Sequence, residues 1–162
     1  MAQLETKIVY SGAVTPVTLG AAGRSVVVGG ETAYPFHLFE GTMPNRPRIA
    51  LEVVDTGPGQ GGAVLDAVFG DATGDPAAWA KKAVSDYKPA LICLTLAGTD
   101  PNGRDDAPEQ AVQTVRAVLS SIDVPLVVWG SGNEAKDAAV LKAVAEACQE
   151  TPLALGPVAE GN

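Results

Sequence analysis

Acid–base or nucleophilic chemistry in this sequence depends on a single histidine. His37 lies in the segment PFHLFEG, residues 35–41, between a glycine pair and a proline-rich turn. Nucleophilic catalysis by a serine or a cysteine needs a histidine held beside it, and His37 is poorly placed for such an arrangement. We therefore predict no catalytic residue. We expect a packed histidine that is hydrogen-bonded to the backbone, with Phe36 and Phe39 as core anchors.

A glycine-rich segment, GPGQGG at residues 57–62, satisfies the pattern Gly-x-Gly-x-x-Gly that many dinucleotide sites carry. It directly follows a predicted strand, which is the position that such a site requires. However, Pro58 interrupts the pattern, and the apolar stretch AVLDAVFG that follows is short. Since the bare pattern is a weak signal, we expect a flexible loop between a strand and a helix. Nucleotide binding is a minor alternative.

A second glycine-rich segment, WGSGNEAKD at residues 129–137, joins a predicted strand to a predicted helix. Backbone N–H groups at a helix N-terminus favour anions and the polar edges of cofactors. A turn capped by asparagine is an equally good interpretation, because asparagine often caps helices. If the segment binds a ligand, the candidate residues are Trp129, Gly130, Ser131, Gly132 and Asn133.

The polar segment GTDPNGRDD, residues 98–106, follows another predicted strand. Asp100 and Asn102 are candidate hydrogen-bonding groups, although a solvated turn is the more common role of such residues. Glu52 places a charge inside an apolar strand, where a carboxylate needs a partner. Arg46 and Arg48 are nearby cations in the sequence, and we expect the role of Glu52 to be structural.

The two cysteines limit metal and disulfide chemistry. Cys93 lies in an apolar run and Cys148 in a helical pattern, and no Cys-x-x-Cys pair is present. Iron–sulfur clusters and structural zinc sites need more ligands than two isolated cysteines provide. We therefore predict reduced core cysteines, with no metal site and no iron–sulfur cluster in this chain.

The composition is that of an acidic globular domain. Hydrophobic residues make up 46% of the 162 residues and aromatic residues only 5%, so the core must consist mainly of Val, Leu, Ile and Ala. A net charge of −8 argues against nucleic acid or an anionic membrane as the main partner. No segment approaches the roughly 18 apolar residues that cross a bilayer, so we expect a cytoplasmic protein.

The order of the apolar runs predicts an α/β fold in two parts. Residues 1–47 carry two β-branched runs, 14–20 and 25–30, that predict a β-hairpin followed by an ordered, proline-containing connection. Residues 48–162 alternate near-continuous apolar strands with amphipathic helices, β-α-β-α-β-α-β, which indicates a parallel sheet covered by helices. The expected strands are 48–55, 90–98, 124–132 and 153–156, and the expected helices are 75–87, 107–122 and 133–150.

Several segments together resemble one protein family. They are GGETAYPFHLFEG, NRPRIALEVVD, a tryptophan-bearing helix, LICLTLAGTDPNG, VPLVVWGSGNEAKDAAVLKAVAEA and LALG, in this order from about Val26 to the C-terminus. With these segments the sequence resembles the small subunit of the corrinoid iron–sulfur protein, also called the delta subunit of acetyl-CoA decarbonylase/synthase.

The resemblance implies a TIM barrel that pairs with a large subunit carrying an iron–sulfur cluster and a corrinoid domain. In that family the two subunits carry a methyl group on cobalt from methyltetrahydrofolate to acetyl-CoA synthase, in the reductive acetyl-CoA (Wood–Ljungdahl) pathway. The small subunit breaks no bond itself, and its barrel mouth caps the corrinoid (cobalamin). A methyltransferase and acetyl-CoA synthase are then transient partners.

The resemblance also bears on the histidine. Corrinoid domains that ligate cobalt use the pattern Asp-x-His-x-x-Gly, but Pro35 and Glu40 stand where that pattern needs aspartate and glycine. His37 also precedes the first predicted barrel strand, whereas barrel chemistry occurs at the carboxyl ends of the strands. We therefore do not expect His37 to ligate cobalt.

At the barrel mouth, the resemblance implies that Asp100 and Asn102 bond corrin amides and that residues 129–133 lie near the corrinoid. The alternative enzyme of this barrel type is a pterin-dependent methyltransferase. Such enzymes carry an acidic residue near the end of the corresponding strand, where this chain has Gly130 and Ser131.

The length departs from the family pattern. A TIM barrel usually needs about 250 residues, and this sequence stops just after its fourth predicted barrel strand. We therefore expect about half of a TIM (β/α)8 barrel, with unpaired strand edges and one exposed apolar face. Three explanations remain open: a fragment, a split product completed by another chain, and a half barrel that self-associates.

Overall fold

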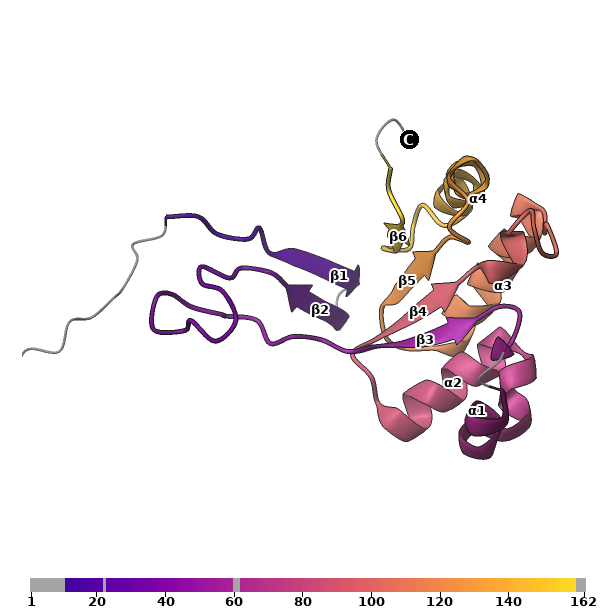
Figure 1. Cartoon of the computed structure of the whole chain (residues 1–162), viewed down its shortest axis with the longest axis horizontal. Helices are drawn as coiled ribbons and strands as arrows, with labels where there is room; N and C mark the ends of the chain where they lie inside the picture. Colours follow the sequence, from indigo (N-terminus) through magenta and orange to yellow (C-terminus); the bar gives the residue numbers. More distant parts are fainter. Residues whose placement is uncertain (1–10, 22, 60–61, 160–162) are drawn as a thin grey trace, which may run out of the picture.

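The computed structural model describes residues 11–21, 23–59 and 62–159 of the chain. It has an α/β fold with two sheets: an N-terminal antiparallel hairpin and a four-stranded parallel sheet with helices (Figure 1). No helix in these ranges is long and apolar enough to cross a membrane. The order of hairpin and parallel sheet agrees with the sequence prediction.

The hairpin consists of β1 (Val17–Ala21) and β2 (Arg24–Val28). Its strands pair antiparallel, with Val17 opposite Val28, as the two β-branched runs predict. The turn end of the hairpin lies against the segment that precedes β5. A Cβ atom on Gly20 would stand 2.7 Å from Cγ of Pro125, so only glycine fits this close approach. The hairpin therefore lies at the amino ends of the parallel strands (Figure 1).

In the parallel sheet, the strands lie side by side in the order in which they occur along the chain. Its strands are β3 (Ala50–Val54), β4 (Leu91–Thr95), β5 (Leu126–Trp129) and β6 (Ala154–Gly156), in the spatial order β3-β4-β5-β6. All three pairings are parallel. This order confirms the predicted alternation, because each helical connection returns the chain to start the next strand beside the last.

The three predicted helices are α2 (Pro76–Tyr87), α3 (Pro108–Ser121) and α4 (Glu134–Ala147). The side chain of Asp75 caps α2 by accepting from the N–H groups of Ala77 and Ala78. One further helix, α1 (Gly62–Phe69), continues into a 3-10 turn, η2 (Gly70–Gly74), and a second 3-10 turn, η3 (Ala97–Thr99), follows β4. Sequence reasoning missed α1, because its apolar residues are too closely spaced to show a one-sided helical pattern.

One face of the sheet packs against the helices and forms the core. Val53, Leu94 and Val128 point to this face and have no exposed surface. Their partners on the helices belong to the same cluster and come from α2, α3 and α4: Trp79, Ala80, Ala83, Ala111, Val115, Val118, Val140, Leu141 and Val144. The opposite face carries half-buried and exposed residues, including Glu52 and Trp129. The sheet therefore has one face that the helices cover and one face that no described helix covers.

The loop 31–43 differs from the prediction of a packed segment. Thr32 and Thr42 close it through two hydrogen bonds of 2.9 Å, and it lies far from the helices (Figure 1). Phe36 is 97% exposed and Phe39 62% exposed, so the expectation that they anchor the core is wrong. The His37 side chain is also exposed and stacks on Phe39, which corrects its predicted packing. The physical reason is that, among the described residues, no second apolar layer covers these rings.

Candidate functional site

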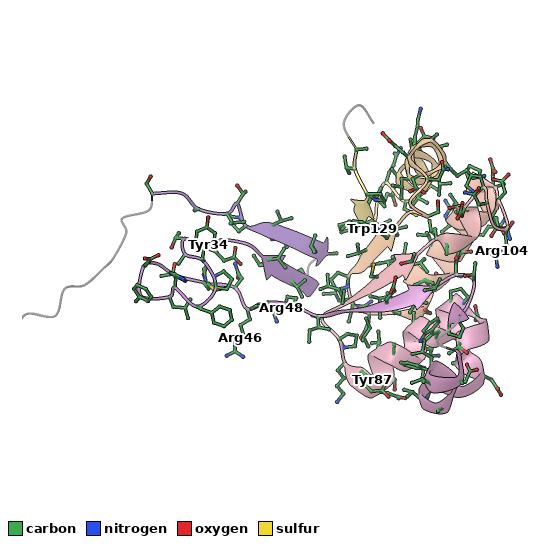
Figure 2. All side chains as sticks on the ribbon, in the orientation of Figure 1. Tyr34, Arg46, Arg48, Tyr87, Arg104 and Trp129 are labelled. Carbon is green, nitrogen blue, oxygen red and sulfur yellow. The ribbon has the colours of Figure 1, made fainter. Side chains whose placement is uncertain are left out.

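The carboxyl ends of β3, β4 and β5 bring three connecting segments to one edge of the sheet. Asp55 follows β3, the segment 96–107 follows β4, and the segment 130–133 follows β5. In TIM barrels the active site, and in open parallel sheets the ligand crevice, lies at this carboxyl edge, where the loops that follow the strands meet. Figure 2 labels Trp129 and Arg104 at this end, whereas Tyr34, Arg46 and Arg48 lie at the other.

The loop between β5 and α4 is organised by Asp137, which sequence reasoning missed. Asp137 is fully buried, and its carboxylate accepts from the N–H and hydroxyl groups of Ser131 at 2.8 and 2.9 Å. It also accepts from the N–H group of Gly132 at 2.8 Å. The N–H groups of Ser131 and Gly132, which were expected to attract an external anion, therefore already donate to the Asp137 carboxylate. The sequence pattern that could have indicated this role is an aspartate four residues after the helix cap Asn133, preceded by Gly-Ser-Gly at residues 130–132.

The neighbouring residues of this loop also have internal partners. Gly130 donates its N–H to the carbonyl of Gly156 at 2.8 Å, and a Cβ atom on Gly130 would collide with the Asp137 carboxylate. Asn133 accepts from the N–H of Lys136 at 3.1 Å, which confirms the predicted helix cap. The backbone of residues 130–133 is consequently a rigid platform rather than a set of open donors.

Trp129 presents an aromatic side chain at this edge. The residue is 46% exposed and lies on the face of the sheet that the helices do not cover. A Cβ atom on Gly156 would stand 2.6 Å from Cζ3 of Trp129, so the ring lies directly against the β6 backbone. A flat, half-exposed aromatic ring held in this way suits packing against a planar or apolar partner.

Asp100 and Asn102 form a turn of their own. Oδ1 of Asp100 accepts from the backbone N–H of Asn102 at 2.9 Å and from its side-chain amide at 3.1 Å. The Asp100 carbonyl accepts from the N–H of Gly103 at 2.9 Å. Asn102 is exposed, while one carboxylate oxygen of Asp100 is used inside the turn. The structure therefore brings the two predicted residues together, with Asn102 as the outward group.

A second acidic centre, at Asp55, was not predicted from the sequence. Its Oδ1 accepts from the N–H of Gly98 at 2.8 Å, which ties the end of β3 to the segment after β4. Burial raises the pKa of the Asp55 carboxyl, while the Gly98 bond and the nearby charge of Arg104 partly oppose the rise. Arg104 in turn donates to Asp106 from Nε at 3.0 Å. Asp55, Arg104 and Asp106 therefore place both acidic and basic groups at this edge.

Glu52 lies on the uncovered face of the sheet. Its carboxylate accepts from the hydroxyl of Thr95 at 2.6 Å, so the expectation that Arg46 or Arg48 is its partner is wrong. In the β3–β4 pairing Cys93 lies opposite Glu52, and Thr95 is two residues further along β4, so the partner of Glu52 comes from the neighbouring strand. Burial raises the pKa of the neighbouring Cys93 thiol, and the charge of Glu52 adds to the rise. Cys93 and Cys148 are both free thiols. Cys148 is buried as predicted, whereas Cys93 is half-buried and lies outside the core cluster, so the prediction that it is a core residue is wrong.

The glycine-rich segment 57–62 falls partly outside the described residues, because Gln60 and Gly61 are not among them. Gly57 has a positive φ of 86° and donates its N–H to the carbonyl of Val54 at 3.1 Å, so it begins a tight turn. In the residues that the structure does describe, no group of three or more His, Cys, Asp or Glu side chains is placed to hold a metal ion.

Comparison with known proteins identifies relatives along nearly the whole described chain. The family model for the CO dehydrogenase/acetyl-CoA synthase delta subunit matches residues 16–157. Acetyl-CoA decarbonylase/synthase complex subunit delta 1 of Methanosarcina thermophila is 38% identical over 130 residues, which are 80% of this chain and 29% of that protein. Subunit delta of Methanothermobacter thermautotrophicus is 39% identical over 142 residues, 86% of this chain and 36% of that protein.

A third relative, the delta subunit of Methanocaldococcus jannaschii, is 35% identical over 135 residues, 83% of this chain and 33% of that protein. The chain thus spans about a third of the length of the curated relatives it matches. The matched range includes the hairpin, the parallel sheet and its helices. The resemblance in the sequence is therefore confirmed, and the chain belongs to the CO dehydrogenase/acetyl-CoA synthase delta subunit family.

Proposed function

We propose that this chain acts as a non-catalytic subunit, or as part of one, of a corrinoid iron–sulfur methyl carrier. It helps to cap a corrinoid (cobalamin) that a large iron–sulfur and corrinoid subunit holds. A methyl group then passes from methyltetrahydrofolate to acetyl-CoA synthase. The observation that carries the proposal is the family match over residues 16–157. The names of the similar proteins describe a subunit of a complex, which supports a role beside other chains.

The geometry of the sheet supports completion of a barrel by further strands. The strands are parallel in sequence order, and α2, α3 and α4 contribute to one core on one face, as in a TIM barrel. No described strand pairs with the outer edges of β3 and β6, and no described helix covers the opposite face. In this proposal a second polypeptide that supplies strands, or another copy of this chain, covers that face.

The residues at the carboxyl edge fit a cap better than a cobalt ligand. The corrinoid, when bound, supplies the cobalt that carries the methyl group. Trp129 supplies a half-exposed aromatic surface for a large ring system, and the exposed amide of Asn102 can donate to its polar substituents. The chain's one histidine lies in the loop 31–43, at the opposite end of the strands. Capping by contact, without a bond to the metal, is the role that these groups support.

A pterin-dependent methyltransferase is the alternative function, and no specific observation favours it. Gly130 and Ser131 occupy the end of β5, where such enzymes are expected to carry an acid. The nearest carboxylate in that loop, Asp137, is buried and accepts three hydrogen bonds from the loop. It therefore has little capacity left to bind a pterin.

The test of the proposal is copurification with the large corrinoid-carrying subunit, followed by a visible spectrum of the complex. We expect the corrinoid and iron–sulfur absorption to appear with the complex and to be absent from the chain alone. Trp129→Ala should reduce the corrinoid retained in the complex. Tyr34→Ala, which removes an exposed aromatic ring from the other end of the molecule, is the matched control and should leave retention unchanged.

Two results would contradict the proposal. One is transfer of a methyl group from methyltetrahydrofolate to free cobalamin by this chain alone, which would make it an enzyme. The other is equal corrinoid retention in Trp129→Ala and wild-type complexes, which would remove the carboxyl edge from the corrinoid contact.

A further inference from the structure

A hollow of about 670 Å³ lies at the amino end of the parallel sheet, away from the candidate site. Three parts of the chain form it: the start of β2, the second half of α2, and the segment that joins α3 to β5. The hairpin contacts Pro125 at this end of the sheet, and β2 lines the hollow together with α2 and the end of α3. The proposed corrinoid cap does not use this hollow.

Three cations border the hollow. Arg24 comes from β2, and Lys81 and Lys88 come from α2 and its C-terminal cap. None of the three forms an ion pair with a residue that the structure describes. By contrast, Lys82, the next residue of the helix, lies 2.8 Å from Asp86. All three residues are exposed, and together they place three positive charges at one hollow of a chain whose net charge is −8.

Complementing the helix dipole explains only part of this cluster. A cation near a helix C-terminus is stabilised by the partial negative charge there, and the effect falls off within the last turn. Lys88 occupies such a position as the C-cap of α2. Lys81 lies in the middle of the helix, and Arg24 lies on a strand, so the dipole of α2 accounts for neither.

The remaining wall of the hollow is partly apolar. Val84, Pro89 and Val124 line it beside the cations. The hydroxyls of Ser120 and Ser121 also line it, but they donate to carbonyl groups of their own helix at 2.8 Å. The three cations are therefore the main donors for a ligand. They outnumber the one carboxylate in the wall, which is that of Asp123.

We propose that this hollow binds an organic phosphate, with the phosphate groups at Arg24, Lys81 and Lys88 and the organic part against the aliphatic wall. A guanidinium and two ammonium groups from separate elements match the several oxygens of a phosphate better than the two of a carboxylate. The volume lies within the range of about 300–1,000 Å³ that small-molecule sites occupy. This site is separate from the proposed corrinoid cap and adds a second ligand to the protein.

Calorimetric titration of the full chain with ADP, pyrophosphate and adenosine, at one fixed ionic strength, tests the proposal. We expect saturable binding of ADP, weaker binding of pyrophosphate and no binding of adenosine. Lys81→Gln and Lys88→Gln should each weaken ADP binding about tenfold, because each removes one charge-assisted hydrogen bond. Lys82→Gln, on the same helix but already paired, is the matched control and should retain wild-type affinity.

The proposal is wrong if ADP shows no saturable binding, or if adenosine binds as well as ADP. It is also wrong if ADP binds equally to the Lys81→Gln, Lys88→Gln double variant, since the nucleotide would then sit elsewhere, for example at the glycine-rich segment 57–62. If Lys82→Gln weakened ADP binding as much as the other two substitutions, the loss would reflect the overall charge of the chain. The proposed site would then be wrong. A thermal melt of each variant, followed by circular dichroism, establishes that it is folded during the titration.

Discussion

The parallel sheet with its helices and the loop 31–43 are ordered by different forces. Leu94, Val115 and Val144 have no exposed surface, because sheet and helices face each other with apolar side chains. In the loop, Phe36 and Tyr34 are 97% and 74% exposed, and the hydrogen bonds between Thr32 and Thr42 close the segment. An aromatic residue therefore becomes a core residue only where a second apolar layer faces it.

The largest effect should come from a cavity in the sheet core. Leu94→Ala should lower the free energy of unfolding by about 2–5 kcal/mol, because a fully buried leucine leaves a space that the core cannot fill. Leu38→Ala, in the exposed loop, should change it by no more than about 0.5 kcal/mol. Urea denaturation of both variants measures the difference. Similar losses for the two variants would mean that the loop is also packed against apolar surface.

The second effect concerns a buried polar group in the same part of the molecule. Asp137→Ala should destabilise the chain by about 1–3 kcal/mol, because the N–H groups of Ser131 and Gly132 would lose their acceptor. Glu134→Ala, an exposed acid in the first turn of the same helix, is the control. Hydrogen exchange at Ser131 and Gly132 should accelerate only in the Asp137 variant. Unchanged protection would show that the loop is held by other contacts.

The features of the fold that could be predicted from the sequence are local ones. The strands and helices of the parallel sheet follow from apolar runs, and the cap at Asp75 follows from its position before Pro76. These features depend on residues that are close in sequence. The wrong predictions concern distant contacts: Glu52 accepts from Thr95 on the neighbouring strand, and no layer of described residues covers Phe36. Local patterns cannot reveal either arrangement.

The candidate site shows the same division. The helix cap at Asn133 and the turn at Asp100 are local, and the sequence indicated both. The contact between Asp55 and Gly98 joins residues 43 positions apart and was not predicted. Asp137 lies inside the glycine-rich segment 129–137, but its role was not predicted, because its burial depends on how α4 packs. Tertiary placement therefore decides which polar groups at this edge are available.

A substitution at Phe36 should stabilise the chain through the backbone of the loop 31–43. Phe36 has a φ of 69°, in the left-handed region that costs a non-glycine residue about 1–2 kcal/mol. Phe36→Gly should therefore raise the free energy of unfolding by up to about 1 kcal/mol, since the exposed ring has little burial to lose. Phe36→Ala is the control, because it removes the ring but keeps the strained backbone. A loss of stability in both variants would indicate that the ring is buried in solution.

The smallest expected effect is a pH dependence that arises from partial burial at Asp55. Burial raises the pKa of this carboxyl above its ordinary value of 3.8, so the folded chain binds more protons than the unfolded chain between the two values. Stability contributed by Asp55 is then fully present below pH 3.8 and is lost as the pH rises through the folded-state pKa.

Asp55→Asn isolates this dependence, because the amide oxygen can still accept from Gly98 but cannot ionise. Relative to this variant, the wild-type chain should lose stability as the pH rises through that interval, and the difference should be constant above it. Arg104→Gln should extend the loss to higher pH, since the Arg104 charge lowers the pKa of Asp55. Urea denaturation between pH 3 and 8 measures all three proteins. A wild-type chain that gains stability over Asp55→Asn as the pH rises would mean that the carboxylate is better stabilised folded than unfolded. In that case the polar contacts at this edge would outweigh burial, and hydrogen bonding would dominate at Asp55 as it does in the loop.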